Sequence, residues 1–444
     1  MDFNGCLDNG VELYTCTDPK LAGFCLSLWI RRGSMHEPAG AHGLVHFLEH
    51  AVFRNISERL NGRLYAELTR HGLCFDACTY TNYVRFEISG LASDFDRGLE
   101  ILMMALEPPE LSIDAMNMER RRIQTEIREE EARSSTDSFA NGMVWHGTQL
   151  ARSIAGTMSS TNRIGFDALR VEHERWFSRG NFFFCATGAV PDTEGLIDRL
   201  RQIETKAICP VVTAAPVPVD FFRRGALTSV RDGFSWLRLS FDVDTARHGE
   251  PLLMGLTEYL LGDVGQLYLA LSEYTGLIYD LGDSFERFSN IGTICFELEP
   301  EQKQLYDALE AAVDVLVKAK HADDDVLSDA IQGLVCNDRI KQDHICTFNS
   351  IWGYDNGMCG CGFQSAQQRS DAYRAVTPEA LRALAAEIFR SDNAVLCVRA
   401  NEKRVRQDRL RDILMTLDQG SDGGSSGTTS KTRSTPPDTE KRMS

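Results

Sequence analysis

The amino-acid sequence predicts an α+β protein of two homologous domains, each an antiparallel-rich sheet packed with helices. The first observation is length, because 444 residues exceed one ordinary domain and suit two or three. The second is an internal repeat, since residues 169–185 and 381–397 align with matching Leu, Arg, Phe, Asn and Cys. The third is that VRFEI at 84–88 aligns with ICFEL at 294–298, within a repeated order of predicted elements.

Hydrophobic periodicity places these elements in the same order in both halves. The first half predicts a strand, two helices, two strands and a helix, at 22–31, 43–53, 58–71, 73–80, 83–90 and 94–107. The second half repeats that order at 235–243, 250–262, 265–274, 277–287, 291–299 and 301–319. The alternative is that two unrelated domains share this coarse pattern by chance.

Composition sets the expected domain boundaries. A stretch with three prolines at 206–225 predicts an extended linker between a first domain, 1–205, and a second domain, 226–418. The stretch 419–444 is rich in Gly, Ser and Thr and has almost no apolar residues. Such a segment cannot bury a core, so a disordered tail is expected.

Charge and cysteine usage exclude several classes of protein. The formal net charge of −17 disfavours binding to nucleic acid and favours attraction for basic peptides. The sequence contains no apolar run long enough to span a membrane, and the N-terminus MDFNGCLDNG lacks the pattern of a secretory signal. Thirteen cysteines without a short-spaced framework are typical of reduced thiols, which predicts a cytoplasmic protein. Because of the charge and the absence of a long apolar run, neither a membrane nor a nucleic acid is expected as a partner.

The segment His46-Phe-Leu-Glu49-His50 carries the clearest chemical signal. It lies in the helix-competent run GLVHFLEHAVF, where residues four apart share a face, so both imidazoles can point at one ion. Glu49 lies on the same face and is free to hold a water molecule. Two imidazoles suit zinc, and a catalytic zinc needs a third protein ligand and one open position. The alternative is a pair of ordinary histidines on an amphipathic helix.

A second helix offers the third ligand. Residues 116–132, MNMERRRIQTEIREEEA, strongly favour a helix on which most acids form a solvated face. Glu119 and Glu126 are two turns apart on one face, so one of them can reach the metal while the other supports it. The basic run 120–122 lies among acids and is interpreted as part of the solvated face.

These motifs resemble the pitrilysin/insulinase-type zinc metallopeptidases, called inverzincins for their H-x-x-E-H order. Residues 43–53 are similar to the family's G-x-x-H-F-x-E-H-x-x-F, and the Glu of an E-x6-E helix follows the second histidine after 76 residues. Residues 76–79, Gly156-Thr157 and 176–190 extend the resemblance over about 10–410. The size is similar to that of short two-domain members, which include mitochondrial processing peptidase subunits and bacterial relatives. The resemblance implies half of a clam-shell chamber.

The resemblance also implies roles for individual residues. His46, His50 and Glu126 would hold one Zn²⁺ per chain, with Glu49 as general base and Glu119 as a supporting acid. The segment Asp76, Ala77, Cys78 and Thr79 would bind substrate as an edge strand, through backbone strand addition. In the repeat, the zinc-site positions are occupied by Leu256, Tyr259, Leu260 and Cys336, so the second domain should bind no metal.

Two positions depart from the family pattern. Asp76 replaces an Asn, which removes an NH2 donor. In the family an Arg and a Tyr, seven residues apart, help to stabilise the developing oxyanion. They correspond here to Ser272 and Tyr279, so the resemblance implies Tyr279 as a catalytic donor, whereas a serine cannot supply a bidentate cation. A homologous partner chain would then supply the Arg in a heterodimer, with a homodimer as second choice. The alternative is that Tyr279 is a core aromatic residue and Ser272 a surface residue.

The sequence therefore predicts a zinc endopeptidase that hydrolyses peptides or unfolded segments, as the catalytic subunit of a dimer. Processing of a leader peptide is one possible role. The alternative is a non-catalytic scaffold or peptide-binding subunit of the same fold, and a third version is a heterodimer inactive without its partner. Zinc content separates the first two hypotheses, since the enzyme needs about one ion per chain.

Overall fold

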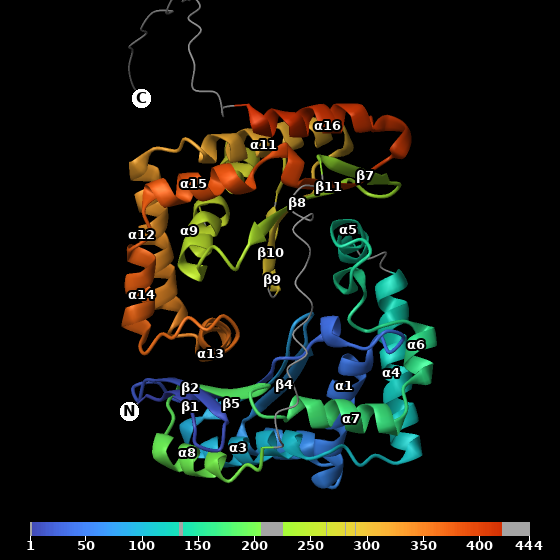
Figure 1. Ribbon diagram of the computed structural model, residues 1–444, viewed down its shortest axis with the longest axis vertical. Coiled ribbons are helices and arrows are strands. Elements are labelled where there is room, and N and C mark those ends of the chain that lie inside the picture. Colours follow the sequence, from blue (N-terminus) through green and yellow to red (C-terminus); the bar gives the residue numbers. More distant parts are fainter. Residues whose placement is uncertain are drawn as a thin grey trace, which may run out of the picture.

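The computed structural model describes residues 2–132, 136–205, 225–262, 264–279, 281–288 and 290–419. The predicted linker, apart from Gly225, and the predicted tail beyond Gln419 lie outside the described residues. Two mixed sheets, each packed with helices, lie one above the other in Figure 1. The predicted α+β class is therefore confirmed.

The first sheet has six strands in the order β1-β2-β6-β3-β5-β4. Only β2 and β6 pair in parallel, and the other neighbours are antiparallel. The strands are β1 (Asn4–Cys6), β2 (Glu12–Thr17), β3 (Gly23–Ile30), β4 (Cys74–Thr79), β5 (Val84–Leu91) and β6 (Phe182–Gly188). The helices of this half are α1 (Leu44–Arg59), α2 (Leu64–His71), α3 (Phe95–Met103), α4 (Ile113–Ala132), α6 (Met158–Arg163), α7 (Phe166–Trp176) and α8 (Thr193–Arg201).

The second sheet has the order β7-β11-β8-β10-β9, which repeats the order β2-β6-β3-β5-β4 of the first. Again one pair, β7 and β11, is parallel. The strands are β7 (Leu227–Arg231), β8 (Trp236–Asp244), β9 (Leu281–Phe288), β10 (Ile291–Leu298) and β11 (Ala394–Arg399). The helices are α9 (Glu250–Leu261), α10 (Gln266–Tyr268), α11 (Leu305–Ala319), α12 (Asp324–Lys341), α14 (Ala366–Arg374), α15 (Pro378–Ile388) and α16 (Gln407–Met415).

The predicted elements of the second half differ from the structure in one place. The expected helix at 265–274 is the short α10 followed by a π-helical turn, Leu269–Glu273, and the expected strand at 277–287 begins only at Leu281. Gly276 takes a left-handed conformation, and the amides of Leu277 and Ile278 donate to the Leu271 carbonyl. These bonds close a turn, so the first apolar residues of the predicted strand belong to it.

Each half contributes one helix to the sheet of the other half. Helix α5 (Thr136–Val144) packs on the second sheet, and α13 (Ile345–Gly353) packs on the first. Around α5 the apolar cluster includes Phe139, Trp145 and Trp236, and around α13 it includes Phe348 and Trp29. Close packing of large aromatic rings on both sides joins the two halves, and the candidate site lies between them.

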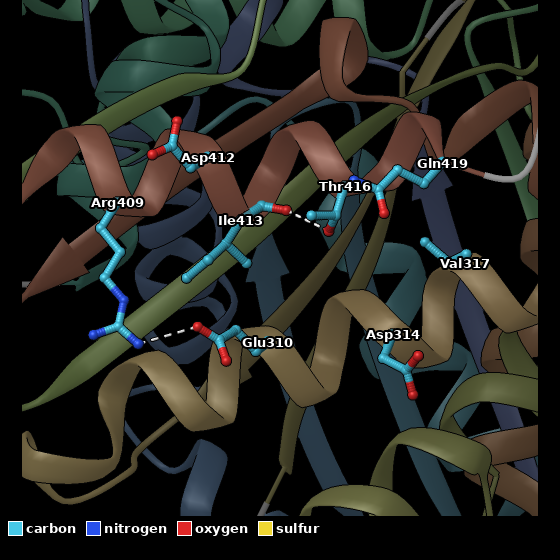
Figure 2. A pocket seen from close by; sticks show the side chains of 8 residues that line it. All are labelled: Glu310, Asp314, Val317, Arg409, Asp412, Ile413, Thr416 and Gln419. Atoms are coloured by element: carbon cyan, nitrogen blue, oxygen red, sulfur yellow. Dashed lines mark hydrogen bonds and ion pairs between the residues drawn. The ribbon is translucent and has the colours of Figure 1, made fainter. Parts of the chain in front are cut away.

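A groove of about 500 Å³ lies between α11 and α16, at the top of the second domain in Figure 1. Figure 2 shows its charged rim, where Arg409 donates to Glu310 at 3.1 Å. Its lining residues are Glu310, Asp314, Val317, Arg409, Asp412, Ile413, Thr416 and Gln419. In the described part of the chain, none of the helices combines the length and the apolar character that crossing a membrane requires.

Candidate metal centre

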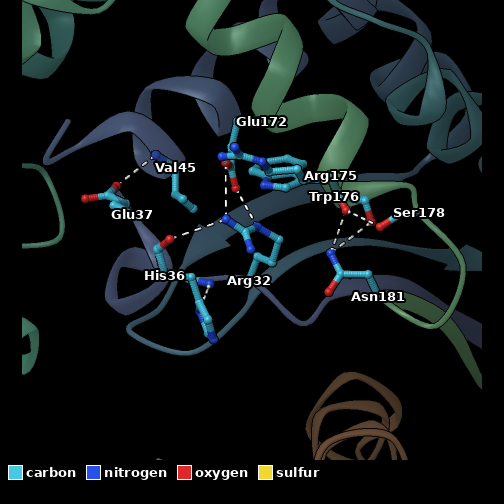
Figure 3. Close-up of polar contacts among 10 residues, drawn as sticks. Arg32, His36, Glu37, Val45, Glu172, Arg175, Trp176, Ser178 and Asn181 are labelled. Carbon is cyan, nitrogen blue, oxygen red and sulfur yellow. Dashed lines mark hydrogen bonds and ion pairs between the residues drawn. The ribbon is translucent and has the colours of Figure 1, made fainter. Parts of the chain in front are cut away.

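The helix that carries His46 and His50 is α1, and a buried carboxylate sets where it begins. Glu37 accepts hydrogen bonds from the amides of Gly43 and Val45, both at 2.9 Å. Figure 3 shows the contact with Val45. Burial raises the pKa of Glu37 to about 8. Because the first amides of a helix have no partners within the helix, Glu37 satisfies donors that would otherwise be buried unpaired.

We expect Glu37→Ala to lower the free energy of unfolding by about 2 kcal/mol, since two buried amides lose their acceptor. Urea unfolding followed by circular dichroism measures the change. Glu58→Ala is the control at the other end of the same helix, because it removes only a partly exposed pair with Arg54. That control should change stability by less than about 0.5 kcal/mol. Equal effects for the two variants would contradict the capping role.

Glycines bring the start of α1 against the segment before α6. Gly43 has φ +84°, and a Cβ on it would lie 2.5 Å from the Ala155 carbonyl oxygen. Gly156 has φ +78°, and its Cβ would meet the His42 carbonyl oxygen at 2.5 Å. Two backbones can approach this closely only where side chains are absent. The pair explains in physical terms why the sequence has glycine at both positions.

A buried ion pair supports the same region from below. Arg32 donates to both carboxylate oxygens of Glu172, at 2.6 and 3.2 Å, and to the His36 carbonyl. Figure 3 shows this pair between β3 and α7, with Asn181 bonded to the carbonyls that end α7. Both charges are buried, so each needs the other, and the pair links the segment just after β3 to α7, which packs against α1.

Helix α4 is held beside α1 by Arg120. Its guanidinium lies over the Phe47 ring at 5.4 Å and donates to the carbonyls of Thr161 and Ile164. The interpretation of 120–122 as a wholly solvated face is therefore wrong for Arg120. Its cation satisfies carbonyls near the end of α6, which ties α4 to α6 and sets the rotation of α4.

The structure brings His46, His50 and Glu126 together. One potential ligand atom from each lies within 4.8 Å of the others. Glu126 Oε2 is 3.7 Å from His46 Nε2 and 3.6 Å from His50 Nε2. The imidazole rings meet edge to face with centroids 4.7 Å apart. Glu126 comes from α4, and its side chain is 48% exposed, so the cluster opens to solvent on the carboxylate side.

These distances suit a metal ion better than hydrogen bonds. A nitrogen–oxygen hydrogen bond spans about 2.7–3.2 Å. Tetrahedral zinc with bonds of about 2.0–2.2 Å separates its ligand atoms by about 3.4 Å, close to the observed spacing. Burial lowers the pKa of His46 to about 3, with a smaller contribution from His50, which keeps that imidazole neutral as a ligand must be. The three residues therefore fit zinc.

Glu119 occupies the position of a supporting acid. Its side chain is only 2% exposed, and Oε2 lies 3.6 Å from His50 Nδ1, on the ring side away from Glu126. Burial alone would lower the pKa of His50, but Glu119, Glu49 and Glu126 outweigh it and raise the pKa. This distance is longer than a hydrogen bond, but a carboxylate so placed attracts the Nδ1–H, which orients the ring and increases the basicity of Nε2.

We expect Glu119→Gln to weaken zinc binding about 10- to 100-fold, the usual effect of losing such a partner. Competition with a chromophoric chelator measures the affinity. Asp114→Asn, an exposed acid in the first turn of the same helix, should leave the affinity unchanged. An unaltered affinity in Glu119→Gln would show that this carboxylate does not orient His50.

Glu49 lies buried beside the cluster with one identified hydrogen-bond donor. The Thr79 hydroxyl donates to Glu49 Oε2 at 3.1 Å. Burial raises the pKa of Glu49, and the nearby His50 and the hydrogen bond from Thr79 only partly offset this. A carboxylate with a raised pKa is a stronger base than an ordinary glutamate, which suits a group that takes a proton from water.

The predicted substrate strand is β4, at the end of the first sheet, where β5 is its only paired neighbour among the described strands. Ala77, Cys78 and Thr79 line the cleft described below, whereas Asp76 does not. Asp76 lies opposite Glu87 of β5 in the strand register. The unpaired edge of β4 leaves backbone groups available for an added strand.

A cleft of about 1190 Å³ separates the two halves at this point. The first half contributes His46, Glu49, Glu126 and the end of β4 to its walls. Opposite them lie residues of the second half, namely Phe234, Arg238, Gly282, Ser284, Glu286 and Glu297. Arg238 is buried and donates to Asp137 Oδ1 at 2.9 Å. The sequence patterns left Arg238 and Glu37 unassigned, because neither belongs to a short motif and each acts through residues of other segments.

The structure does not bring Tyr279 to the cleft. Its side chain is 95% exposed and is absent from the cleft lining, so it is not a core aromatic residue either. Ser272 lies in the π-helical turn, where its carbonyl accepts from Gly276. In the repeat positions of the second half, Leu256, Tyr259 and Leu260 are buried in an apolar core.

Two family profiles match this chain. Residues 18–158 match the profile of the insulinase family (peptidase family M16), and residues 163–334 match that of the peptidase M16 inactive domain. The β subunit of the mitochondrial-processing peptidase of Bos taurus is 27% identical over 161 residues. That match covers 36% of this chain and 33% of the relative, so it spans about a third of the relative's length.

Solved structures show the same fold over most of the chain. A protease from Helicobacter pylori has a TM-score of 0.74 and 15% identity, covering 90% of this chain and 99% of that chain. A peptidase M16 inactive domain from Pseudomonas fluorescens has a TM-score of 0.74 and 14% identity, covering 90% and 97%. Together the two profile matches span more than half of the 444 residues. The chain therefore belongs to the insulinase family of peptidases, family M16.

Proposed function

We propose that this chain is a zinc-dependent endopeptidase that hydrolyses peptides or unfolded segments. The observation that carries the proposal is the cluster of His46, His50 and Glu126, at ligand spacing, with the buried carboxyl group of Glu49 beside it. The side chain of Glu126 is about half exposed and lines the cleft, which leaves room for substrate. The chain would hold one zinc ion in this centre.

The residues around the centre divide the chemistry among them. Zinc, when bound, lowers the pKa of a bound water toward ~7 and polarises the substrate carbonyl. Glu49 takes a proton from the attacking water and delivers it to the leaving amine as the peptide bond breaks. The Thr79 hydroxyl, donating to Glu49 Oε2, leaves the other carboxylate oxygen for this transfer. Glu119 keeps the His50 ring oriented throughout.

The edge of β4 supports an extended substrate. A peptide paired with that edge would run past Ala77 and Thr79. The Thr79 hydroxyl contacts Glu49, so the peptide would pass close to the proposed base. Backbone pairing requires an extended chain and tolerates many side chains. A folded domain offers no such strand to a cleft of about 1190 Å³, so short or unfolded polypeptides are the proposed substrates.

The charge of the cleft walls favours basic peptides. Five acidic side chains join Glu49 and Glu126 in the lining, against Arg152 and Arg238: Glu129, Glu130, Asp137, Glu286 and Glu297. Arg238 is already paired with Asp137 and lies 3.5 Å from Glu297. Burial raises the pKa of Glu286 and of Glu297, so a cationic side chain entering the cleft would favour their ionised forms.

Cleavage of an unfolded basic polypeptide by the full chain, followed by mass spectrometry, tests the proposal. Zinc-loaded protein should produce fragments, a chelator should stop the reaction, and added Zn²⁺ should restore it. A matched acidic polypeptide should be cleaved more slowly. If neither zinc-loaded protein nor a mixture with its partner chain cleaves any substrate, the chain is a scaffold or peptide-binding subunit instead.

We further propose that the active form is a dimer with a homologous chain. The exposed position of Tyr279 and the Ser272 that replaces the expected Arg both indicate that this chain does not complete the site alone. The matched Bos taurus relative is itself named as a subunit. A heterodimer whose partner supplies the missing cation is the preferred form. Full activity of the purified chain as a monomer would contradict it.

A further inference from the structure

A second group of metal-ligating side chains lies on the opposite side of the first sheet from α1. Cys25 on β3, Glu87 on β5 and Cys346 in the first turn of α13 place one sulfur or oxygen atom each within 4.8 Å of one another. Cys25 is buried, whereas Cys346 and Glu87 are half-buried. An ion can therefore enter the group from solvent on one side.

The register of the sheet explains why the two strands supply adjacent ligands. Cys25 lies opposite Ser89, and Ser27 lies opposite Glu87, in the antiparallel pair β3–β5. Cys25 and Glu87 are therefore diagonal neighbours on the face that α13 covers. Ser89, on the same face and two residues from Glu87, offers a hydroxyl beside Cys346.

Helix α13 is held in place by contacts that do not involve the thiols. Thr187 donates to the Ile345 carbonyl at 3.0 Å, and the Asn349 amide donates to the carbonyls of Cys25 and Cys185 at 3.0 and 3.1 Å. A Cβ on Gly188 would lie 2.9 Å from Ile345, so the absence of that side chain lets the helix approach closely. The position of Cys346 over Cys25 is therefore set by packing.

The chemistry of the group fits a thiophilic divalent ion. Zinc bound by two thiolates at about 2.3 Å separates the sulfurs by about 3.8 Å, within the observed spacing. A hydrogen bond from the Cys25 thiol lowers the pKa of Cys346, whereas burial raises the pKa of Cys25 well above its usual value, so the ion would have to displace the proton of Cys25 on binding. Two thiolates and a carboxylate exceed the charge of the ion by one, and Arg85, 3.5 Å from Glu87, balances it.

We propose that Cys25, Glu87 and Cys346 form a second, structural zinc site that fastens α13 to the first sheet, with the Ser89 hydroxyl or a water in the fourth position. Because α13 lies between β10 and β11 of the second sheet in the chain, the bound ion would cross-link the two halves of the molecule. Such a site would stabilise the cleft without taking part in hydrolysis, since it lies on the other face of the sheet from α1.

Zinc counting in the full chain tests the proposal. Wild-type protein loaded with Zn²⁺ under reducing conditions and desalted should hold two ions, by elemental analysis. Cys346→Ser and His50→Ala should each hold one, and the double variant none. Cys336→Ser is the matched control, because that thiol is exposed on α12, and it should still hold two. Should Cys346→Ser fail to fold, Glu87→Gln, which leaves both thiols in place, should show the same loss.

Cobalt provides an independent spectroscopic measure. His50→Ala loaded with Co²⁺ should show a thiolate-to-cobalt charge-transfer band, and the double variant His50→Ala/Cys346→Ser should lack it. These measurements do not depend on peptide cleavage, so they separate this proposal from the proposed function. A single zinc ion in wild type that is lost in His50→Ala, or a second ion that persists in Cys346→Ser, would overturn it. A disulfide between Cys25 and Cys346, identified by peptide mapping of the unreduced protein, would overturn it as well.

Discussion

Replacing Glu49 with glutamine should lower kcat for peptide hydrolysis about 10²- to 10⁴-fold, the range for losing a general base. The amide keeps the size of the side chain and can still contact the Thr79 hydroxyl, but it cannot take a proton from water. Zinc content should stay unchanged, because Glu49 is not among the clustered ligand atoms. Steady-state cleavage of an unfolded peptide, with the partner chain present, measures the effect.

The matched control is Glu58→Gln on the same helix. Glu58 pairs with Arg54 on the partly exposed last turn of α1, so its loss should leave kcat unchanged. A Glu49→Gln variant that keeps its zinc and more than about a tenth of wild-type kcat would rule out Glu49 as the base. A variant that loses zinc as well would instead show that Glu49 maintains the metal cluster.

Replacing His50 with alanine should remove the zinc ion of this centre and reduce hydrolysis to background. A catalytic zinc is held by three protein ligands, and Glu126 Oε2 lies within 3.7 Å of both imidazoles. Loss of the His50 imidazole leaves only two ligands, too few to hold the ion. Glu119 would also be left buried without its imidazole neighbour. Elemental analysis together with the peptide assay measures both effects.

His71→Ala is the control for a histidine outside the cluster. His71 ends α2 and contacts Asp94 at 2.7 Å, so the variant should keep both zinc and activity. If His50→Ala binds zinc as tightly as wild type, the cluster is not a metal centre, and the peptidase proposal falls with it. Zinc bound at the proposed second site has to be subtracted from the zinc count of His50→Ala. Measuring the effect of His50→Ala in a Cys346→Ser background removes that contribution.

Much of the fold follows from local pattern. Alternation at 83–90 predicted β5, and helical periodicity at 43–53 predicted α1, because a single strand or helix buries one face by its own period. The repeated order of elements predicted the shared topology of the two sheets. The three-residue β1 and the turn closed at Gly276 were not predicted, since hydrogen bonds to distant residues or a single glycine conformation decide them.

The candidate site, like the fold, was predicted in part from local pattern and in part decided by tertiary contacts. The i, i+4 spacing of His46 and His50 already placed both imidazoles on one face. The residues alone left Glu119 and Glu126 as alternatives for the third ligand, and only the resemblance favoured Glu126. The structure places Glu126 near both Nε2 atoms and Glu119 at the His50 Nδ1 atom. Arg120, bonded to carbonyls of Thr161 and Ile164, sets that choice by fixing the rotation of α4.

The sequence by itself determined the two-fold repeat, the histidine pair and the class of metal they suit, because these depend on spacing within one helix or on the order of elements. Only the tertiary structure decided which acid meets the imidazoles and that Tyr279 points to solvent. It also decided that α5 packs on the second sheet and α13 on the first. The physical reason is that such contacts join residues far apart in the chain. Their geometry comes from close packing of whole elements, which no local period encodes.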